Sequence, residues 1–277
     1  MVVKKSRAIW LSDVHLGTRD AKSEYLLDFL RRNESEYLYL VGDILDFWKI
    51  RSKWFWPAIN NEIVNLVLQK ARSGTKVIYI PGNHDDVLRK YSNCRINGVR
   101  ILAEAIHETA DGRKFLILHG DEFDLVSTYS KWLAKLGSDA YQFLLSLNRF
   151  VNFFRRKMGK EYWSLSAYLK HKVKEAVNFI GNFEKSITAE AKRRKVDGLI
   201  CGHIHHAAFA QMSGVFYRNI GDWVESCTAL VENAAGNLQI VRWAEQTTIL
   251  YDERSLILKQ APSYANYYSN GRLASTS

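Results

Sequence analysis

Five short segments of the chain carry side chains that could bind metal ions. They are Asp13-Val14-His15, Gly42-Asp43, Gly82-Asn83-His84-Asp85, His119-Gly120-Asp121 and Gly202-His203-Ile204-His205. Carboxylate oxygens, an amide oxygen and imidazole nitrogens are hard or borderline ligands, and none of the five segments contains a thiol. A single histidine in such a place is commonly a packing residue, but five polar clusters in one context indicate a shared site. The segments predict a two-metal site that hydrolyses phosphate esters.

The elements that must position these segments are strands. Each segment directly follows an apolar run, at residues 8–11, 37–41, 76–80, 114–118 and 198–201. Strand ends that meet at one edge of a sheet are where α/β proteins assemble their sites. We therefore expect the five segments to converge in space, although they are spread over about 190 positions of the sequence.

The predicted ligands divide into two groups that share one carboxylate. Asp43 follows a strand and a glycine, and is the candidate bridge between two metal ions. Asp13 and His15 lie two residues apart in an extended segment, so both project to one side and suit the first metal. The other predicted ligands are Asn83, His119 and His203 for the second metal and His205 for the first. This set without sulfur fits Mn²⁺, Fe or Zn²⁺ better than Ca²⁺.

His84 is assigned a catalytic role instead of a metal. It stands between the predicted ligand Asn83 and Asp85, which could orient its imidazole as a carboxylate orients a general acid–base histidine. A protonated His84 could bind a phosphate oxygen or protonate the leaving group. The competing interpretation is that His84 is only a structural neighbour of Asn83. Asn83, His84 and Asp121 are the residues predicted to contact the substrate.

Composition narrows the class of protein. The chain has 277 residues, of which 47% are hydrophobic, and only three cysteines without a Cys-x-x-Cys spacing. These features predict a substantial core and a reducing compartment. No apolar run approaches the roughly 18 residues of a membrane span, so we expect a cytoplasmic protein, at most peripheral to a membrane. The net charge of +10 favours anionic partners, without choosing among nucleotides, nucleic acid and acidic lipids.

The order of elements predicts an α/β core that is interrupted once. Strands alternate with helices near 22–32 and 58–72, and extended segments return at 207–212, 215–219, 228–232 and 238–243. Residues 1–124 and 195–255 are therefore assigned to the core, and 256–277 to a partly ordered tail.

Residues 125–194 are predicted to form a helical insertion, or cap. An apolar stripe follows the spacing of one helix face, and residues 149–174 contain eight Lys or Arg but only one acidic residue, Glu161. The stripe consists of Phe143, Leu147, Phe150, Val151 and Phe154. Two interpretations remain open, a solvated helix pair that packs on the core and a cap over a bulky anionic substrate.

In order and spacing, the five segments resemble the calcineurin-like metallophosphoesterases. The resemblance implies a four-layer α/β/β/α sandwich with a dinuclear site, usually dependent on Mn²⁺ in bacterial members. It implies one metal held by Asp13, His15, Asp43 and His205, and another held by Asp43, Asn83, His119 and His203. It makes His84 the catalytic histidine.

A narrower resemblance is to the UDP-2,3-diacylglucosamine pyrophosphohydrolases of lipid A synthesis. It rests on residues 40–48 (Leu-Val-Gly-Asp-Ile-Leu-Asp-Phe-Trp), on His119-Gly120-Asp121 and on residues 219–223 (Asn-Ile-Gly-Asp-Trp). It implies cleavage to UMP and diacylglucosamine 1-phosphate at an anionic membrane surface, with a nucleotide-linked glycolipid as the partner. No obligate protein partner is evident from the sequence. Those enzymes carry Arg where this chain has His84. The alternatives are a general phosphomonoesterase or phosphodiesterase, or, less favoured, a nuclease.

Overall fold

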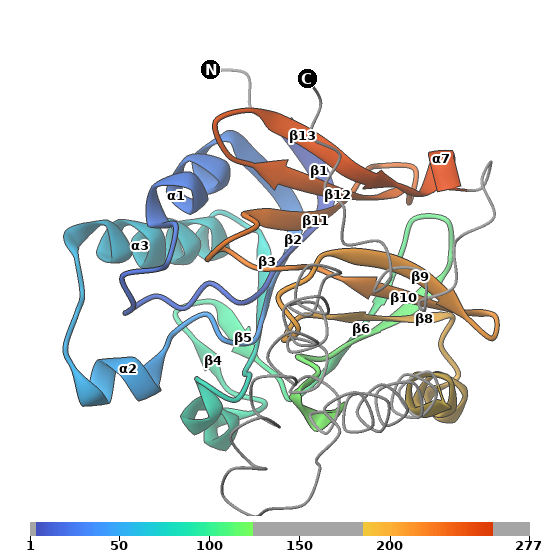
Figure 1. Ribbon diagram of the computed structural model, residues 1–277, viewed down its shortest axis with the longest axis horizontal. Coiled ribbons are helices and arrows are strands. Elements are labelled where there is room, and N and C mark those ends of the chain that lie inside the picture. Colours follow the sequence, from blue (N-terminus) through green and yellow to red (C-terminus); the bar gives the residue numbers. More distant parts are fainter. Residues whose placement is uncertain (1–3, 124–184, 257–277) are drawn as a thin grey trace, which may run out of the picture. The chain divides into compact units, whose positions relative to one another are not determined.

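Two β-sheets form the part of the chain that the computed structural model describes, residues 4–123 and 185–256 (Figure 1). These residues belong almost entirely to one compact unit, made of 1–122 and 187–261. The insertion expected at 125–194 lies outside the described residues, except for a helix at 185–194. The tail expected at 256–277 lies outside them beyond Leu256.

The larger sheet has eight strands in the order β13-β12-β11-β1-β2-β3-β5-β4. Its parallel centre has the crossover helices that the alternating pattern predicted, and the antiparallel strands lie on both sides of it. The parallel strands are β1 (Lys4–Leu11), β2 (Asn33–Val41), β3 (Lys76–Ile80) and β5 (Val99–Ile101). The antiparallel strands are β4 (Arg95–Ile96), β11 (Thr228–Glu232), β12 (Leu238–Trp243) and β13 (Thr247–Asp252).

The smaller sheet has five strands in the order β6-β7-β8-β10-β9. Strands β7, β8 and β10 are parallel, while β6 and β9 close the edges as antiparallel partners. The turn between β6 and β7 contains Gly112 at φ +88°, a left-handed conformation that glycine adopts without strain. The strands are β6 (Ala105–Glu108), β7 (Lys114–Ile117), β8 (Gly198–Cys201), β9 (Ala208–Met212) and β10 (Val215–Asn219).

One buried cluster lies between the two sheets. Trp10 and Leu230 of the larger sheet pack in the same core as Phe115, Ile200 and Phe209 of the smaller one. All five side chains are at most 1% exposed. Side chains alternate between the two faces of a strand, so each strand gives this cluster every second residue. The shared core holds the two sheets face to face.

Helices cover the outer face of the larger sheet. Helix α1 (Ser23–Arg32) contributes Leu30, and helix α3 (Ala58–Arg72) contributes Ile63, to a second buried cluster with strand residues such as Leu38. The helix at 185–194 buries Ile187 and Ala191 completely. The described residues thus confirm the α/β class, with two sheets and helices packed beside them.

Short helices complete the described elements. Helix α2 (Phe47–Ser52) and helix α7 (Glu253–Leu256) are α-helical, while Asp86–Tyr91 and Asp121–Phe123 are 3₁₀ turns. Helix α2 exists because the Asp46 carboxylate accepts a hydrogen bond from the Lys49 N–H, which is an N-cap. No helix in the described part of the chain is long and apolar enough to cross a bilayer.

Candidate metal centre

The five predicted segments come together at the ends of strands from both sheets. The Asp13 N–H donates to the Gly42 carbonyl at 3.1 Å, and the Gly42 N–H donates to the Ile80 carbonyl at 2.7 Å. These bonds join the loops that follow β1, β2 and β3. The Gly202 N–H donates to the His119 carbonyl at 2.9 Å and joins the loops that follow β7 and β8. The convergence expected from the positions of the strand ends is therefore observed.

Left-handed backbone conformations concentrate in these loops. Ten non-glycine residues with positive φ are found in the described chain, and five of them are predicted ligands. Such conformations cost energy for residues with a Cβ and are typical of functional sites. The five, with φ between 51° and 70°, are Asp13, His15, Asp43, His203 and His205. The sharp bends turn their side chains away from the strand direction.

Two glycines allow the backbone to approach the predicted ligands closely. A Cβ on Gly42 would collide with the imidazole of His119, and Gly42 has φ +71°. A Cβ on Gly82 would collide with both the Asp43 carboxylate and the His119 ring. Only glycine leaves room for the imidazole and the carboxylate at these positions.

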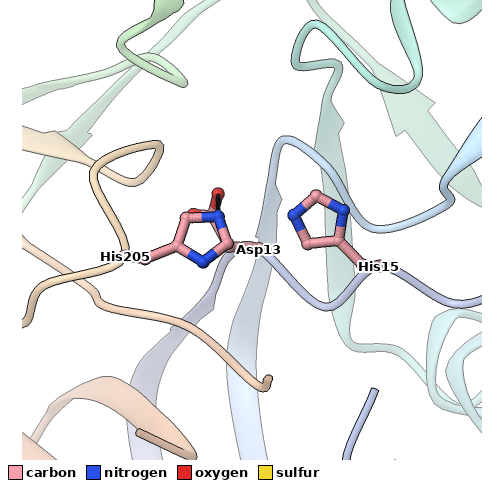
Figure 2. Close-up of side chains that lie close together, drawn as sticks. All are labelled: Asp13, His15 and His205. Carbon is pink, nitrogen blue, oxygen red and sulfur yellow. Dashed lines mark ion pairs between the residues drawn. The ribbon is translucent and has the colours of Figure 1, made fainter. Parts of the chain in front are cut away.

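The first group of candidate ligands consists of Asp13, His15 and His205. Their ligand atoms lie within 4.8 Å of one another, and Asp13 Oδ1 is 3.1 Å from His205 Nε2. In Figure 2 the Asp13 carboxylate lies partly behind the His205 imidazole, and the His15 imidazole, from a separate loop, stands beside them. Asp13 Oδ2 accepts hydrogen bonds from the Ser12 hydroxyl at 2.5 Å and the His203 N–H at 2.8 Å. The second oxygen therefore fixes the carboxylate and leaves Oδ1 toward the histidines.

The second group consists of Asp43, His119 and His203. His119 Nε2 lies 3.4 Å from Asp43 Oδ2, and the rings of His119 and His203 meet edge to face at 5.0 Å. His119 Nδ1 is 3.2 Å from the Val41 carbonyl. A proton on Nδ1 would therefore leave Nε2 as the coordinating nitrogen.

Asp43 lies between the two groups. Its Oδ2 is 3.4 Å from His119 Nε2 and 3.9 Å from His15 Nε2. Its Oδ1 accepts a hydrogen bond from the His84 N–H at 2.8 Å, which fixes the orientation of the carboxylate. One oxygen atom of Asp43 thus faces a histidine from each group, which is the position that a bridging ligand requires.

The donor atoms fit the metal ions expected of such a site. Eleven buried side-chain nitrogen or oxygen atoms have no hydrogen-bond partner among the described residues, and five of them lie at this site. They are Asp13 Oδ1, His15 Nε2, Asn83 Oδ1, His84 Nδ1 and His119 Nε2. All but Asn83 Oδ1 face an Asp or His side chain of the site, but without the geometry of a hydrogen bond. A buried polar atom without a partner is costly. Four of these five atoms belong to predicted metal ligands.

The electrostatics of the site favour bound cations. Asp13, Asp43, Asp46 and Asp85 are at most 2% exposed, and none of them pairs with a lysine or arginine in the described chain. Burial opposes a charged imidazole, but the Asp43 and Asp13 carboxylates outweigh it and raise the pKa of His119 to about 9. The negative field that favours an imidazolium also favours a metal ion.

A third group joins His84 to the site through Asp46. Asp46 Oδ2 lies 3.1 Å from His15 Nδ1 and 3.1 Å from His84 Nδ1. Burial lowers the pKa of His84, but Asp46 and the other nearby carboxylates outweigh it, so the net shift is upward. Asp46 was not among the predicted site residues. The sequence feature that could have identified Asp46 is its position three residues after Asp43, within the segment 40–48 that carries the narrower resemblance.

The structure corrects the expected role of Asp85. Asp85 does not orient the imidazole of His84, because both of its oxygens have other partners. Its Oδ2 accepts from the Ile44 N–H at 2.9 Å and the Tyr79 hydroxyl at 2.5 Å, and its Oδ1 accepts from the Gly82 N–H at 2.6 Å. Asp85 therefore ties together the loops that carry Asp43 and Asn83, and Asp46 occupies the place beside His84.

Replacing Asp85 with alanine is expected to destabilise the fold. The substitution would leave two buried N–H groups and the Tyr79 hydroxyl without an acceptor, at a cost of about 3 kcal/mol or more. Urea unfolding should show the loss as a lower midpoint with an unchanged slope. The exposed Asp86 next to it is the matched control, and Asp86→Ala should change stability by less than about 0.5 kcal/mol. Equal midpoints for the two variants would contradict the anchoring role.

Two further side chains lie at the edge of the site. Asp121 Oδ2 accepts from Arg89 Nη2 at 2.6 Å, and its predicted contact with substrate stays a prediction. The Trp48 ring, which is 51% exposed, lies 4.1 Å from the His84 ring at a tilt of 32°. Trp48 thus gives the His84 side of the site an exposed aromatic surface.

Comparison with known proteins identifies the family of this chain. The family model described as calcineurin-like phosphoesterase matches residues 6–207. A UDP-2,3-diacylglucosamine hydrolase of Aliivibrio fischeri is 27% identical over 78% of this chain and 90% of its own length. One from Histophilus somni (strain 2336) is 28% identical over 83% of this chain and 97% of its own length.

Two solved structures align with the chain at low sequence identity. YfcE, a phosphoesterase from E. coli, aligns with a TM-score of 0.46 at 13% identity, over 88% of this chain and 97% of its own. Vps29 of Entamoeba histolytica in complex with Zn²⁺ aligns with a TM-score of 0.43 at 13% identity, over 88% and 98%. The family match confirms the resemblance seen in the sequence. This chain belongs to the calcineurin-like phosphoesterase family, whose members are metal-dependent phosphoesterases.

Proposed function

We propose that this chain hydrolyses the diphosphate bond of a UDP-linked diacylglucosamine, giving UMP and 2,3-diacylglucosamine 1-phosphate, with two divalent metal ions. The proposal of two metal ions is supported by the position of Asp43 Oδ2, which lies 3.4 Å from His119 Nε2 and 3.9 Å from His15 Nε2. The substrate is proposed because relatives that match most of this chain bear its name.

Seven side chains would hold the metals in this proposal. Asp13, His15 and His205 would bind one ion, Asn83, His119 and His203 the other, and Asp43 would bridge them. The chemistry that the ions supply is activation of a water molecule and neutralisation of charge on the phosphoryl oxygens. Oxygen and imidazole donors without a thiolate favour Mn²⁺, with Fe and Zn²⁺ as the alternatives.

His84 would act on the phosphate directly. Its Nδ1 faces Asp46 at 3.1 Å, which leaves Nε2 for the substrate. A carboxylate beside one nitrogen stabilises the protonated ring, so His84 would donate a proton or a hydrogen bond through Nε2. In that role His84 binds an oxygen of the phosphate or protonates the departing oxygen. Asp46, in contact with both His15 and His84, would orient the two rings.

In this proposal the insertion at 125–194 binds the lipid part of the substrate. Its apolar stripe would hold acyl chains, and its Lys and Arg residues would approach anionic headgroups. This arrangement would place the reaction in the cytoplasm, on a peripheral contact with the inner membrane. No nucleic acid and no obligate protein partner enters the proposal.

Acylated substrate should bind far better than its deacylated counterpart. Each buried CH₂ contributes about 0.8 kcal/mol, so exchanging Phe150 and Phe154 for serine should raise KM for the acylated substrate at least tenfold. KM for a small chromogenic diester should change less than twofold. Equal losses on both substrates would mean that the variant had damaged the site instead of lipid binding.

A substrate panel tests the proposed function itself. Initial rates with Mn²⁺ would be compared for UDP-diacylglucosamine, UDP-glucosamine, p-nitrophenyl phosphate esters and single-stranded DNA. We expect kcat/KM to be highest for UDP-diacylglucosamine, with UMP as one product. A preference for the nitrophenyl esters would replace the proposal with a general phosphoesterase, and a preference for DNA would replace it with a nuclease.

A further inference from the structure

A cavity of about 680 Å³ opens at the end of the strands away from the metal centre. Its walls come from both sheets, with Tyr37 of β2 and Lys76 of β3 on one side and Ile106 of β6 on the other. Tyr37 precedes Asp43 by six residues. Tyr39, which also lines the cavity, precedes Asp43 by four residues. A strand rises about 3.3 Å per residue, so the nearest part of this wall lies about 13 Å along β2 from the metal centre. The cavity is therefore a separate feature of the fold.

Cations gather at this cavity without acidic partners. Arg95 and Arg100 line it, and they are direct cross-strand partners in the β4–β5 ladder. Directly opposed side chains lie on the same face, and like charges in that position repel. Neither arginine forms an ion pair with a described residue, and the same holds for Lys76. Glu104, the acidic residue of the lining, is paired with Arg194 at 2.5 Å.

An aromatic wall adjoins these cations. Tyr37 stacks on Tyr39 at 6.1 Å, and Tyr39 stacks on Trp10 at 5.4 Å, with interplanar angles of 5° and 7°. The Tyr39 hydroxyl is 3.0 Å from His107 Nδ1, and His107 Nε2 is 2.8 Å from Glu232. This buried chain of contacts fixes the tyrosines in place. Lys76 Nζ donates to the Tyr37 hydroxyl at 3.0 Å and lies 4.6 Å from the centre of the Tyr37 ring. The rings and this cation therefore make a preorganised surface for an anionic group with an aromatic or apolar neighbour.

We propose that this cavity binds a phosphomonoester that carries an aromatic or apolar group. Arg95 and Arg100 hold the phosphate, because two guanidinium forks match its oxygens, and Lys76 adds a third positive charge. Tyr37 and Ile106 contact the organic part of the ligand, and Ile106 is 54% exposed for a large apolar side chain. The bound dianion removes the repulsion between the two arginines. The source of the phosphate is either a small molecule or an acidic lipid headgroup.

The test uses the full chain with its metals and two probes. Phenylphosphonate represents the soluble source, because the enzyme cannot hydrolyse its carbon–phosphorus bond, and phosphatidylcholine vesicles with phosphatidic acid represent the lipid source. Binding would be measured by calorimetry, and hydrogen exchange would locate it. We expect one of the probes to bind and to protect residues 95–106. The double variant Arg95→Gln, Arg100→Gln should weaken that binding at least tenfold and abolish the protection.

Two controls separate a binding site from a structural role. Lys4→Gln with Lys192→Gln removes the same charge from exposed positions outside the cavity and should leave binding unchanged. Without ligand, the double arginine variant should melt no lower than the native chain, because it loses a repulsion. If the double variant Arg95→Gln, Arg100→Gln bound both probes as tightly as the native chain, the proposal would be overturned. The absence of binding by either probe, or an equal loss in the Lys4 and Lys192 control, would also overturn it.

Discussion

Asp43→Ala is expected to abolish phosphoesterase activity and to reduce bound metal from two ions per chain to one or none. Asp43 Oδ2 faces histidines of both groups, at 3.4 and 3.9 Å. Its loss removes the shared ligand and leaves the two groups of ligands without the carboxylate between them. A fall in kcat/KM of at least about 10³-fold is expected where metal chemistry is lost. Metal content by mass spectrometry and steady-state rates would be measured on the same samples.

A second substitution separates the metal bridge from the fold. Asp43 Oδ1 also accepts the His84 N–H, so alanine could act through the loop alone. Asp43→Asn keeps an acceptor of the same shape but removes the charge, and should lose activity nearly as far as alanine. Asp20→Ala, an exposed carboxylate outside the three Asp/His groups, should keep both metals and full rate. Two bound metals and native activity in either Asp43 variant would refute the bridge.

Strand positions followed directly from apolar patterning. The extended segments predicted at 76–80, 215–219, 228–232 and 238–243 are β3, β10, β11 and β12 with the same bounds. Strand β11 is buried at every residue and β10 at all but one, because both faces of a strand in a layered core are covered. Strand β13 was missed. It is an edge strand whose residues are all exposed or half-buried, and its short run Ile249-Leu250-Tyr251 does not alternate with polar residues.

The site was predictable as a set of residues but not as a set of contacts. Asp13, His15, Asp43, His119, His203 and His205 gather because strand ends meet. The carboxylate beside His84 could not be assigned by position in the chain. Asp85 is adjacent to His84, yet its oxygens bind backbone N–H groups of other loops, while Asp46 reaches His84 from the loop after β2. These contacts depend on which loops lie next to each other in the fold. Contacts between loops that are distant in sequence produce no pattern in the local sequence.

His84→Ala is expected to keep both metals and to lose roughly 10²- to 10⁴-fold in kcat. The imidazole approaches the site from the Asp46 side and belongs to neither of the groups joined by Asp43. Removing it would take away a proton donor without taking away a shared ligand. His206→Ala, an exposed neighbour of His205 outside those groups, is the control and should retain rate and metal. Metal loss in the His84 variant would reassign His84 as a ligand.

The pH dependence of kcat gives His84 a signature that a structural role would not have. Burial disfavours the imidazolium, but contact with Asp46 and the charges of Asp43 and Asp85 raise the pKa of His84 above its usual value. An acid must be protonated to act, so activity should persist below this raised pKa and fall as the pH rises through it. Asp46→Asn removes one of the charges that favour the imidazolium and should move the alkaline limb to lower pH. His84→Gln should lack that limb. If the fall of kcat at high pH occurs at the same pH in Asp46→Asn, and is still present in His84→Gln, another group supplies the proton.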